Sequence, residues 1–212
     1  MLRALAEVGL RRGEVRGLRW PDINPAAPRL TVTRQVVDER SPGGGRRKLV
    51  KAPKSGRTSV VAISPTFAAR LADWYAVSVI EGGGPADGDA WPGRNRGPMN
   101  GRSLAQTLER ACERIGLGEY YETTSAKGER VTRFRALLSP HRVRHSAASV
   151  MISAGVPLPA VAAQLTHSEA SITARTYAHV IDDDLDRAAA IFERHHGEAH
   201  SEVIPARAET PH

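Results

Sequence analysis

Histidine and arginine side chains recur at helical spacing in one segment of the last third of the chain. In residues 139–155, His141, Arg144 and His145 stand at positions i, i+3 and i+4, which share one face of a helix. This face lies near the start of the expected helix, where unpaired N–H groups favour anions. An arginine there can fork onto two phosphate oxygens, and a histidine beside it can move a proton near neutral pH. The pattern therefore predicts chemistry on a phosphate.

A second segment, residues 165–180, adds a histidine and a tyrosine, His167 and Tyr177. A tyrosine hydroxyl has a pKa of about 10 and is a weak nucleophile unless cations and a proton acceptor lie close to it. A lone tyrosine on a helix is more often a half-buried structural residue, so both interpretations stay open on spacing alone.

A metal site is the competing interpretation of the paired histidines. Histidines four residues apart can share a zinc ion, but the supporting HExxH pattern has glutamate second, where this chain has Arg142. That arginine would repel a cation, and we therefore expect no metal and no cofactor. The single cysteine, Cys112, excludes internal disulfides and cysteine-rich zinc sites and is expected to be core filler.

The charge of the chain favours a polyanionic partner. Its 212 residues hold 30 Lys and Arg against 23 Asp and Glu, a net charge of +7. Residues 11–19, 46–57 and 127–145 form three basic islands, each of which could be a solvated surface. If folding gathers them, they form a phosphate-binding face with salt-dependent affinity. No apolar stretch reaches the roughly 20 residues that span a bilayer, and no secretory signal is evident. We expect a cytoplasmic protein without a membrane partner.

The periodicity predicts a mainly α fold with a small antiparallel three-stranded β-sheet (α+β). Strand-like alternation is confined to the region between residues 29 and 63, whereas residues 118–135 match neither periodicity. The predicted strands comprise residues 29–37 and a hairpin of 48–53 with 58–63, whose turn is 54–57. The predicted helices begin near residue 1, at Ser64-Pro65, near Leu104, at Ser139-Pro140, at Pro157, near Ala170 and at Asp182.

Four sequence boxes resemble those of the tyrosine recombinases, the phage integrase family. The last third reads His141-Arg142-Val143-Arg144, then Leu165-Thr166-His167-Ser168-Glu169, then Tyr177-Ala178-His179. Near the start, GLRRGEVRGLRWPDIN resembles the box of the first catalytic arginine, and APKSGRTSVVAI resembles the β-hairpin lysine motif. The resemblance covers nearly all of residues 4–194 and implies the catalytic-domain fold of that family.

The resemblance also implies a role for each matching residue. Tyr177 would attack a DNA phosphodiester, giving a 3′-phosphotyrosyl link and a free 5′-hydroxyl. Arg11 and Arg144 would hold the non-bridging oxygens where charge develops. Glu14 would be the acid that supports the first arginine.

Three further residues complete the set that the resemblance implies. His167 would hydrogen-bond the same phosphate, and His141 would manage the tyrosine proton. Lys54 would protonate the leaving 5′-oxygen, with Lys51 as the alternative hairpin lysine. The covalent link keeps the bond energy, so the reaction needs neither metal nor ATP.

The sequence departs from the family pattern at two points. Thr166 replaces the usual glycine before His167, which should alter that turn. The chain also begins almost at the first box, so we expect a catalytic domain over residues 1–195 whose preceding helix and DNA-clamping domain are missing, with a disordered tail over 196–212.

Three function classes follow from the sequence. The first is a site-specific DNA recombinase or integrase of a mobile element. The second is a non-catalytic DNA-binding remnant of a truncated integrase, and the third is a metal-dependent hydrolase that uses the histidines. For the first, the resemblance implies double-stranded DNA at specific recombination sites, a homo-tetramer on paired sites, accessory DNA-bending proteins as further partners, and a place at the bacterial nucleoid.

Overall fold

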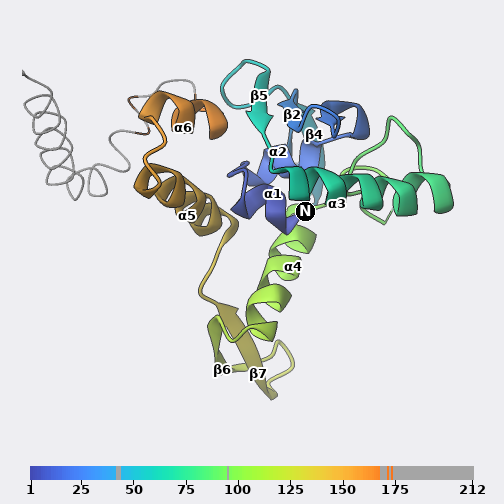
Figure 1. Cartoon of the computed structure of the whole chain (residues 1–212). Coiled ribbons are helices and arrows are strands. Elements are labelled where there is room, and N and C mark those ends of the chain that lie inside the picture. Colours follow the sequence, from blue (N-terminus) through green and yellow to red (C-terminus); the bar gives the residue numbers. More distant parts are fainter. Residues whose placement is uncertain (42–43, 95, 168–170, 172, 174–212) are drawn as a thin grey trace, which may run out of the picture.

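The structure is a computed structural model that combines helices with small antiparallel sheets (Figure 1). It describes residues 1–41, 44–94, 96–167, 171 and 173. The helical elements are α1 (Leu2–Ala6), α2 (Arg12–Gly17), η1 (Trp20–Asp22), α3 (Pro65–Tyr75), η2 (Ala76–Glu81), α4 (Gly101–Arg114), α5 (Pro140–Ser153) and α6 (Leu158–Gln164). The strands are β1 (Ile23–Asn24), β2 (Arg29–Val32), β3 (Gln35–Arg40), β4 (Arg46–Lys51), β5 (Ser59–Ala62), β6 (Gly118–Thr124) and β7 (Arg130–Ala136).

The helices surround a three-stranded antiparallel sheet with the order β1-β2-β5. In this sheet Leu30 lies opposite Val61, and both side chains are buried. The main apolar core joins α1, α2, the sheet, α3 and α4, while α5 and α6 share a smaller cluster around Ile152 and Leu165. In Figure 1, α3 lies on one side of α1, and α5 and α6 lie on the other. The α+β class with small antiparallel sheets is thus confirmed, but the third strand of the central sheet is the short β1 and not the predicted segment 48–53.

The strand predicted over residues 29–37 is wrong as a single element. Residues 29–32 form β2 in the sheet, and residues 35–40 form β3 in a separate two-stranded ribbon with β4. Arg34 lies between them and is held by the protein, because its Nε donates to the carbonyl of Gly17 at 2.7 Å and its Nη2 contacts Asp89. These contacts hold the chain at the point where it leaves the sheet, and period-two alternation carries no sign of them.

The predicted hairpin of residues 48–53 with 58–63 is also wrong in its pairing. β4 pairs with β3, placing Val50 opposite Val36, whereas β5 pairs with β2. The connecting residues still turn where expected, since the Gly56 N–H bonds to the Pro53 carbonyl at 2.9 Å. The chain therefore passes from the ribbon to the sheet at this turn.

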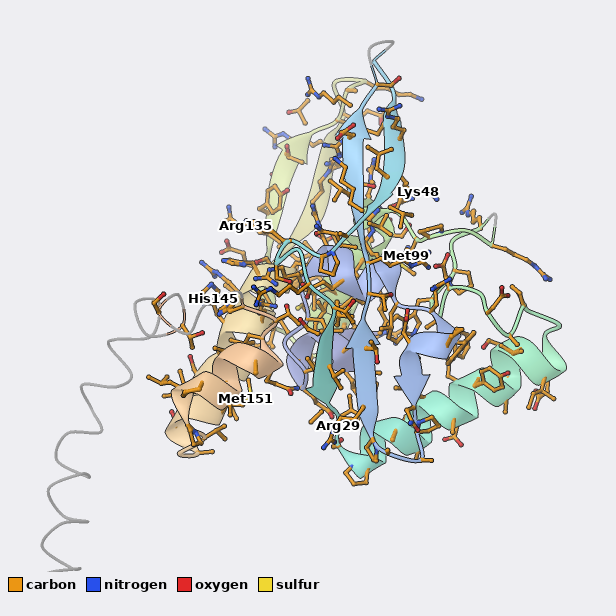
Figure 2. The ribbon with its side chains drawn as sticks, turned by 90° about the horizontal axis from the view of Figure 1, so that it is seen from above. Arg29, Lys48, Met99, Arg135, His145 and Met151 are labelled. Atoms are coloured by element: carbon orange, nitrogen blue, oxygen red, sulfur yellow. The ribbon has the colours of Figure 1, made fainter. Side chains whose placement is uncertain are left out.

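Residues 118–135, which the sequence left unassigned, belong to a second two-stranded ribbon, β6–β7. Tyr120 and Phe134 face each other across it with ring centroids 5.2 Å apart. Polar residues on both faces hide the alternation of a strand with one buried side. In Figure 2 this ribbon and β3–β4 extend beyond the rest of the domain on the same side.

Both predicted Ser-Pro helix starts are confirmed. The Ser64 hydroxyl accepts from the Phe67 N–H at 3.1 Å, and Ser139 accepts from Arg142 at 3.2 Å. Cys112 is buried, as expected. The helices predicted near residues 170 and 182 and the tail over 196–212 lie outside the described residues. Within the described part of the chain, no helix combines the length and apolar character needed to cross a membrane.

Candidate active site

A buried carboxylate, Glu14, lies at the centre of the candidate site. Arg11 precedes α2, and the first turn of that helix brings Glu14 back onto it in a capping box. Glu14 Oε2 accepts from the Arg11 backbone N–H at 2.7 Å, and Oε1 accepts from Arg11 Nη1 at 2.8 Å. The Glu14 side chain is fully buried, whereas that of Arg11 is 26% exposed. The carboxylate therefore holds a guanidinium group that still reaches the surface.

A second guanidinium group, that of Arg144 on α5, approaches the same carboxylate from the interior. Its Nη1 lies 3.9 Å from Glu14 Oε2 and donates to the Gly9 carbonyl at 2.5 Å, and its Nη2 donates to the Leu165 carbonyl. Gly9 has φ +73°, and a Cβ there would lie 2.6 Å from Leu165 Cδ2. Glycine is therefore required where the segment before α2 passes the end of α6. Two arginines 133 positions apart thus share one buried negative charge.

The end of α6 supplies the third side of the site. Arg11 Nη1 donates to the Thr166 carbonyl at 3.0 Å and to its hydroxyl at 2.6 Å, and that hydroxyl donates to Glu14 Oε1 at 2.9 Å. All of the Arg11 side-chain hydrogen bonds among the described residues use Nη1. The Nε–Nη2 edge of Arg11, which has the spacing of a bidentate oxyanion contact, is left for another acceptor.

His167 follows Thr166 directly and is neutral near pH 7. Burial, and then the positive charges of Arg144 and Arg11, lower the pKa of its imidazole to about 4. Nδ1 of the ring lies 2.7 Å from the Thr173 hydroxyl oxygen, which fixes the ring orientation. When Nδ1 accepts the hydroxyl proton, Nε2 carries the ring proton and can donate it to an oxyanion.

His141 and His145 form a hydrogen-bonded pair on α5. Their Nε2 atoms lie 2.8 Å apart, and the rings meet edge to face with centroids 4.3 Å apart. Burial and the neighbouring charges of His141 and Arg144 lower the pKa of His145. One ring must donate to the other at this distance, so each imidazole fixes the orientation of its neighbour. Figure 2 shows the labelled His145 where α5 meets the body of the domain.

The candidate lysine and tyrosine are not among the residues joined to this group. Lys54 lies exposed in the turn before β5, and its side chain takes part in none of the hydrogen bonds or ion pairs among the described residues. Lys51, the alternative hairpin lysine, is paired with Glu39 on the β3–β4 ribbon at 2.9 Å. Tyr177 lies outside the described residues. The structure therefore brings together Arg11, Arg144 and His167, with His141 joined to them through His145.

Sequence reasoning assigned no role to three groups that position these side chains. The His145 ring was visible only through its spacing from His141. The Thr173 hydroxyl and the Gly9 carbonyl carried no sequence signal, because a hydroxyl or a carbonyl acquires such a role only when the fold places it beside an imidazole or a guanidinium group. Among the described residues, no group of three or more His, Cys, Asp or Glu side chains is arranged to hold a metal ion.

Comparison with known proteins identifies the family. The model of the phage integrase family matches residues 1–183. The chain belongs to the phage integrase family. A tyrosine recombinase XerC of Xylella fastidiosa strain M23 is 26% identical over 182 residues, which cover 84% of this chain and 48% of that protein. A XerC-like tyrosine recombinase of Caldanaerobacter subterraneus is 27% identical over 183 residues, covering 82% and 43%. This phage integrase family chain thus spans about half the length of the curated relatives it matches.

Solved structures of phage integrase family proteins share the fold. The Tn1549 transposon integrase in complex with transposon right end DNA superposes with a TM-score of 0.62 at 21% identity, covering 90% of this chain and 56% of that one. XerA recombinase superposes with a TM-score of 0.54 at 17% identity, covering 82% and 50%. The fold predicted from the sequence boxes, that of a tyrosine recombinase catalytic domain, is confirmed.

Proposed function

We propose that this chain is the catalytic domain of a site-specific DNA recombinase that cleaves and rejoins strands through Tyr177. One observation carries the proposal. Arg11 and Arg144 are held on the buried Glu14 beside the neutral imidazole of His167, and the Nε–Nη2 edge of Arg11 is left for an oxyanion. A phosphodiester is the substrate that such an array of donors fits, and the Tn1549 transposon integrase, which shares the fold, is in complex with transposon right end DNA in its solved structure.

The reaction begins with attack of the Tyr177 hydroxyl oxygen on the phosphorus atom. The new bond is a 3′-phosphotyrosyl ester, and the bond between phosphorus and the 5′-oxygen breaks. The tyrosine proton passes to His141, whose ring is held by His145 through the Nε2–Nε2 contact at 2.8 Å. Lys54, in its exposed turn, gives a proton to the departing 5′-oxygen. Rejoining reverses these steps, with a 5′-hydroxyl as the nucleophile.

The arginines and His167 stabilise the charge that develops on the non-bridging oxygens. Arg11 contacts the phosphate through its Nε–Nη2 edge, and Arg144, which is 95% buried, adds a second positive charge at fixed distance. His167 donates one hydrogen bond as a neutral ring. Because all three groups are oriented before the substrate arrives, they need no reorganisation in the transition state.

The same proposal extends to organisation and partners. Residues 1–195 form the catalytic domain. The partner is double-stranded DNA at specific recombination sites in the bacterial nucleoid, where four copies assemble on two paired sites with the aid of DNA-bending proteins. A tetramer on paired sites binds DNA through several domains at once, which raises the overall affinity above that of one domain.

A covalent-trapping experiment tests the proposed chemistry. The chain is incubated with a pool of nicked duplexes of randomised sequence in buffer containing EDTA. A nick beside the cleaved phosphate lets the short 5′-hydroxyl strand diffuse away, so that the adduct accumulates. We expect a shifted band on a denaturing gel. Tyr177→Phe should abolish it with little loss of DNA affinity, because the hydroxyl adds little to phosphate binding.

Tyr120→Phe is the matched control, since Tyr120 is an exposed tyrosine on the β6–β7 ribbon. It should form the adduct as the wild type does. An adduct in the Tyr177→Phe variant would show that the nucleophile is misassigned. DNA binding without any adduct would instead identify a DNA-binding protein of this fold, and cleavage that EDTA abolishes would identify a metal-dependent hydrolase.

A further inference from the structure

Thr166 occupies a backbone position at which glycine is the usual residue. α6 ends in a Schellman motif, in which the His167 N–H bonds to the Ala162 carbonyl at 2.9 Å and the Thr166 N–H bonds to the Ala163 carbonyl at 3.0 Å. The residue at this point of the motif adopts the left-handed conformation, and Thr166 has φ +55°. A β-branched residue is strained there, whereas glycine is not. The threonine therefore destabilises the turn that it forms.

The hydroxyl of Thr166 gives that strained residue a function. It lies between the two charged groups of the site, accepting from Arg11 Nη1 at 2.6 Å and donating to Glu14 Oε1 at 2.9 Å. Thr166 is 1% exposed, so water has little access to replace these bonds. A glycine would keep the carbonyl contact to Arg11 and lose both hydroxyl bonds.

We propose that Thr166 is a positioning residue whose hydroxyl fixes the Nη1 side of Arg11 against Glu14, so that the Nε–Nη2 edge of Arg11 faces a DNA phosphate. The proposal rests on the function proposed above. The Thr166 hydroxyl is then the third acceptor that holds Arg11 Nη1, beside the Glu14 carboxylate and the Thr166 carbonyl. This role explains why a strained threonine occupies the turn.

Three substitutions of Thr166 separate its hydroxyl from its shape and its strain. Thr166→Val keeps the branched shape and the strain but removes the hydroxyl. Thr166→Ser keeps the hydroxyl, and Thr166→Gly removes both the hydroxyl and the strain. Thr33→Val is the matched control, because the Thr33 hydroxyl also donates to a carboxylate, Asp22 at 3.1 Å, away from the site.

The first measurement needs neither DNA nor catalysis. Nitrogen-15 NMR of the arginine guanidinium groups, assigned with Arg11→Lys, reports how fast the Arg11 Nη groups rotate. Slow rotation and separate Nη signals are expected in the wild type and in Thr166→Ser, because Nη1 is held by three acceptors. Faster rotation than in the wild type is expected in Thr166→Val and Thr166→Gly, in which only the Glu14 carboxylate and the backbone carbonyl of residue 166 still hold Nη1. Equal rotation rates in all four proteins would overturn the proposal.

The second measurement is the rate of covalent adduct formation on the nicked duplex. We expect a loss of about tenfold to a hundredfold in Thr166→Val and Thr166→Gly, the scale of a catalytic group displaced by about 1 Å. Thr166→Ser and Thr33→Val should stay near the wild-type rate. The urea midpoint of each variant is measured alongside, so that a rate lost through unfolding is separated from a rate lost through displacement of Arg11.

These outcomes keep the two proposals distinguishable. If the wild type forms no adduct, the proposed recombinase function fails, and the NMR comparison still decides the role of Thr166. If the wild type forms the adduct and Thr166→Val and Thr166→Gly form it at the same rate, the recombinase function stands and the positioning role of Thr166 is refuted. A loss of rate in proportion to a loss of folded protein would mark a merely structural role and would equally refute it.

Discussion

Replacing Glu14 by glutamine tests whether one buried carboxylate organises the site. The change is nearly isosteric and removes the negative charge between Arg11 and Arg144. In the wild type the carboxylate accepts three hydrogen bonds of 2.7–2.9 Å and lies 3.9 Å from Arg144 Nη1. A glutamine keeps one acceptor oxygen and turns an amide NH₂ group toward donors.

The expected cost follows from these contacts. A hydrogen bond to a charged group contributes about 1.5–3 kcal/mol, and removing one member of a buried ion pair costs about 3–5 kcal/mol. Because the Arg144 side chain keeps its bonds to the Gly9 and Leu165 carbonyls, we expect the lower figure, about 3 kcal/mol less free energy of unfolding. For a domain of this size that is a fall in Tm of roughly 6–12 °C.

Urea denaturation followed by circular dichroism measures this change, with thermal melting as a second measurement. Glu39→Gln is the matched control, because Glu39 contacts Lys51 at 2.9 Å and Arg47 at 3.4 Å but is exposed. That control should leave the urea midpoint almost unchanged. A Glu14→Gln protein that lost less than about 1 kcal/mol would refute the idea that this carboxylate is the main counter-charge of the two arginines.

Three further predictions concern other parts of the domain. The pKa of His167 is lowered from 6.5 to about 4, so between these pH values the unfolded chain binds a proton that the folded chain does not. Acidification from pH 6.5 to 4 should therefore lower the free energy of unfolding more for the wild type than for His167→Asn, as measured by urea denaturation at several pH values. Equal pH dependence would contradict the lowered pKa. Ser139→Ala should cost about 1 kcal/mol through loss of the α5 cap, and an unchanged urea midpoint would count against it. Asp38→Asn should cost about 3 kcal/mol because it leaves the buried Arg16 guanidinium without its counter-charge, which a Tm close to wild type would disprove.

The sequence by itself determined the family, the fold class and the identity of the chemical groups. Residue type and spacing are local properties, so the pattern from His141 to Arg144 and the box around Arg11 could be read directly. Helix starts at Ser64 and Ser139 were equally accessible, because a Ser-Pro pair sets both the cap and the first helical residue within a few positions.

The tertiary structure alone decided which strands pair and how the site is held. Alternation predicts a strand but does not identify its partner, so the pairing of β4 with β3 and of β5 with β2 could not be predicted from the sequence. The same limit applies to Thr166, which in the sequence was a small departure from a pattern. Its φ of +55° and its place between Arg11 and Glu14, 155 and 152 positions away, depend on how α6 packs beside α2, and no local pattern records a contact over that separation.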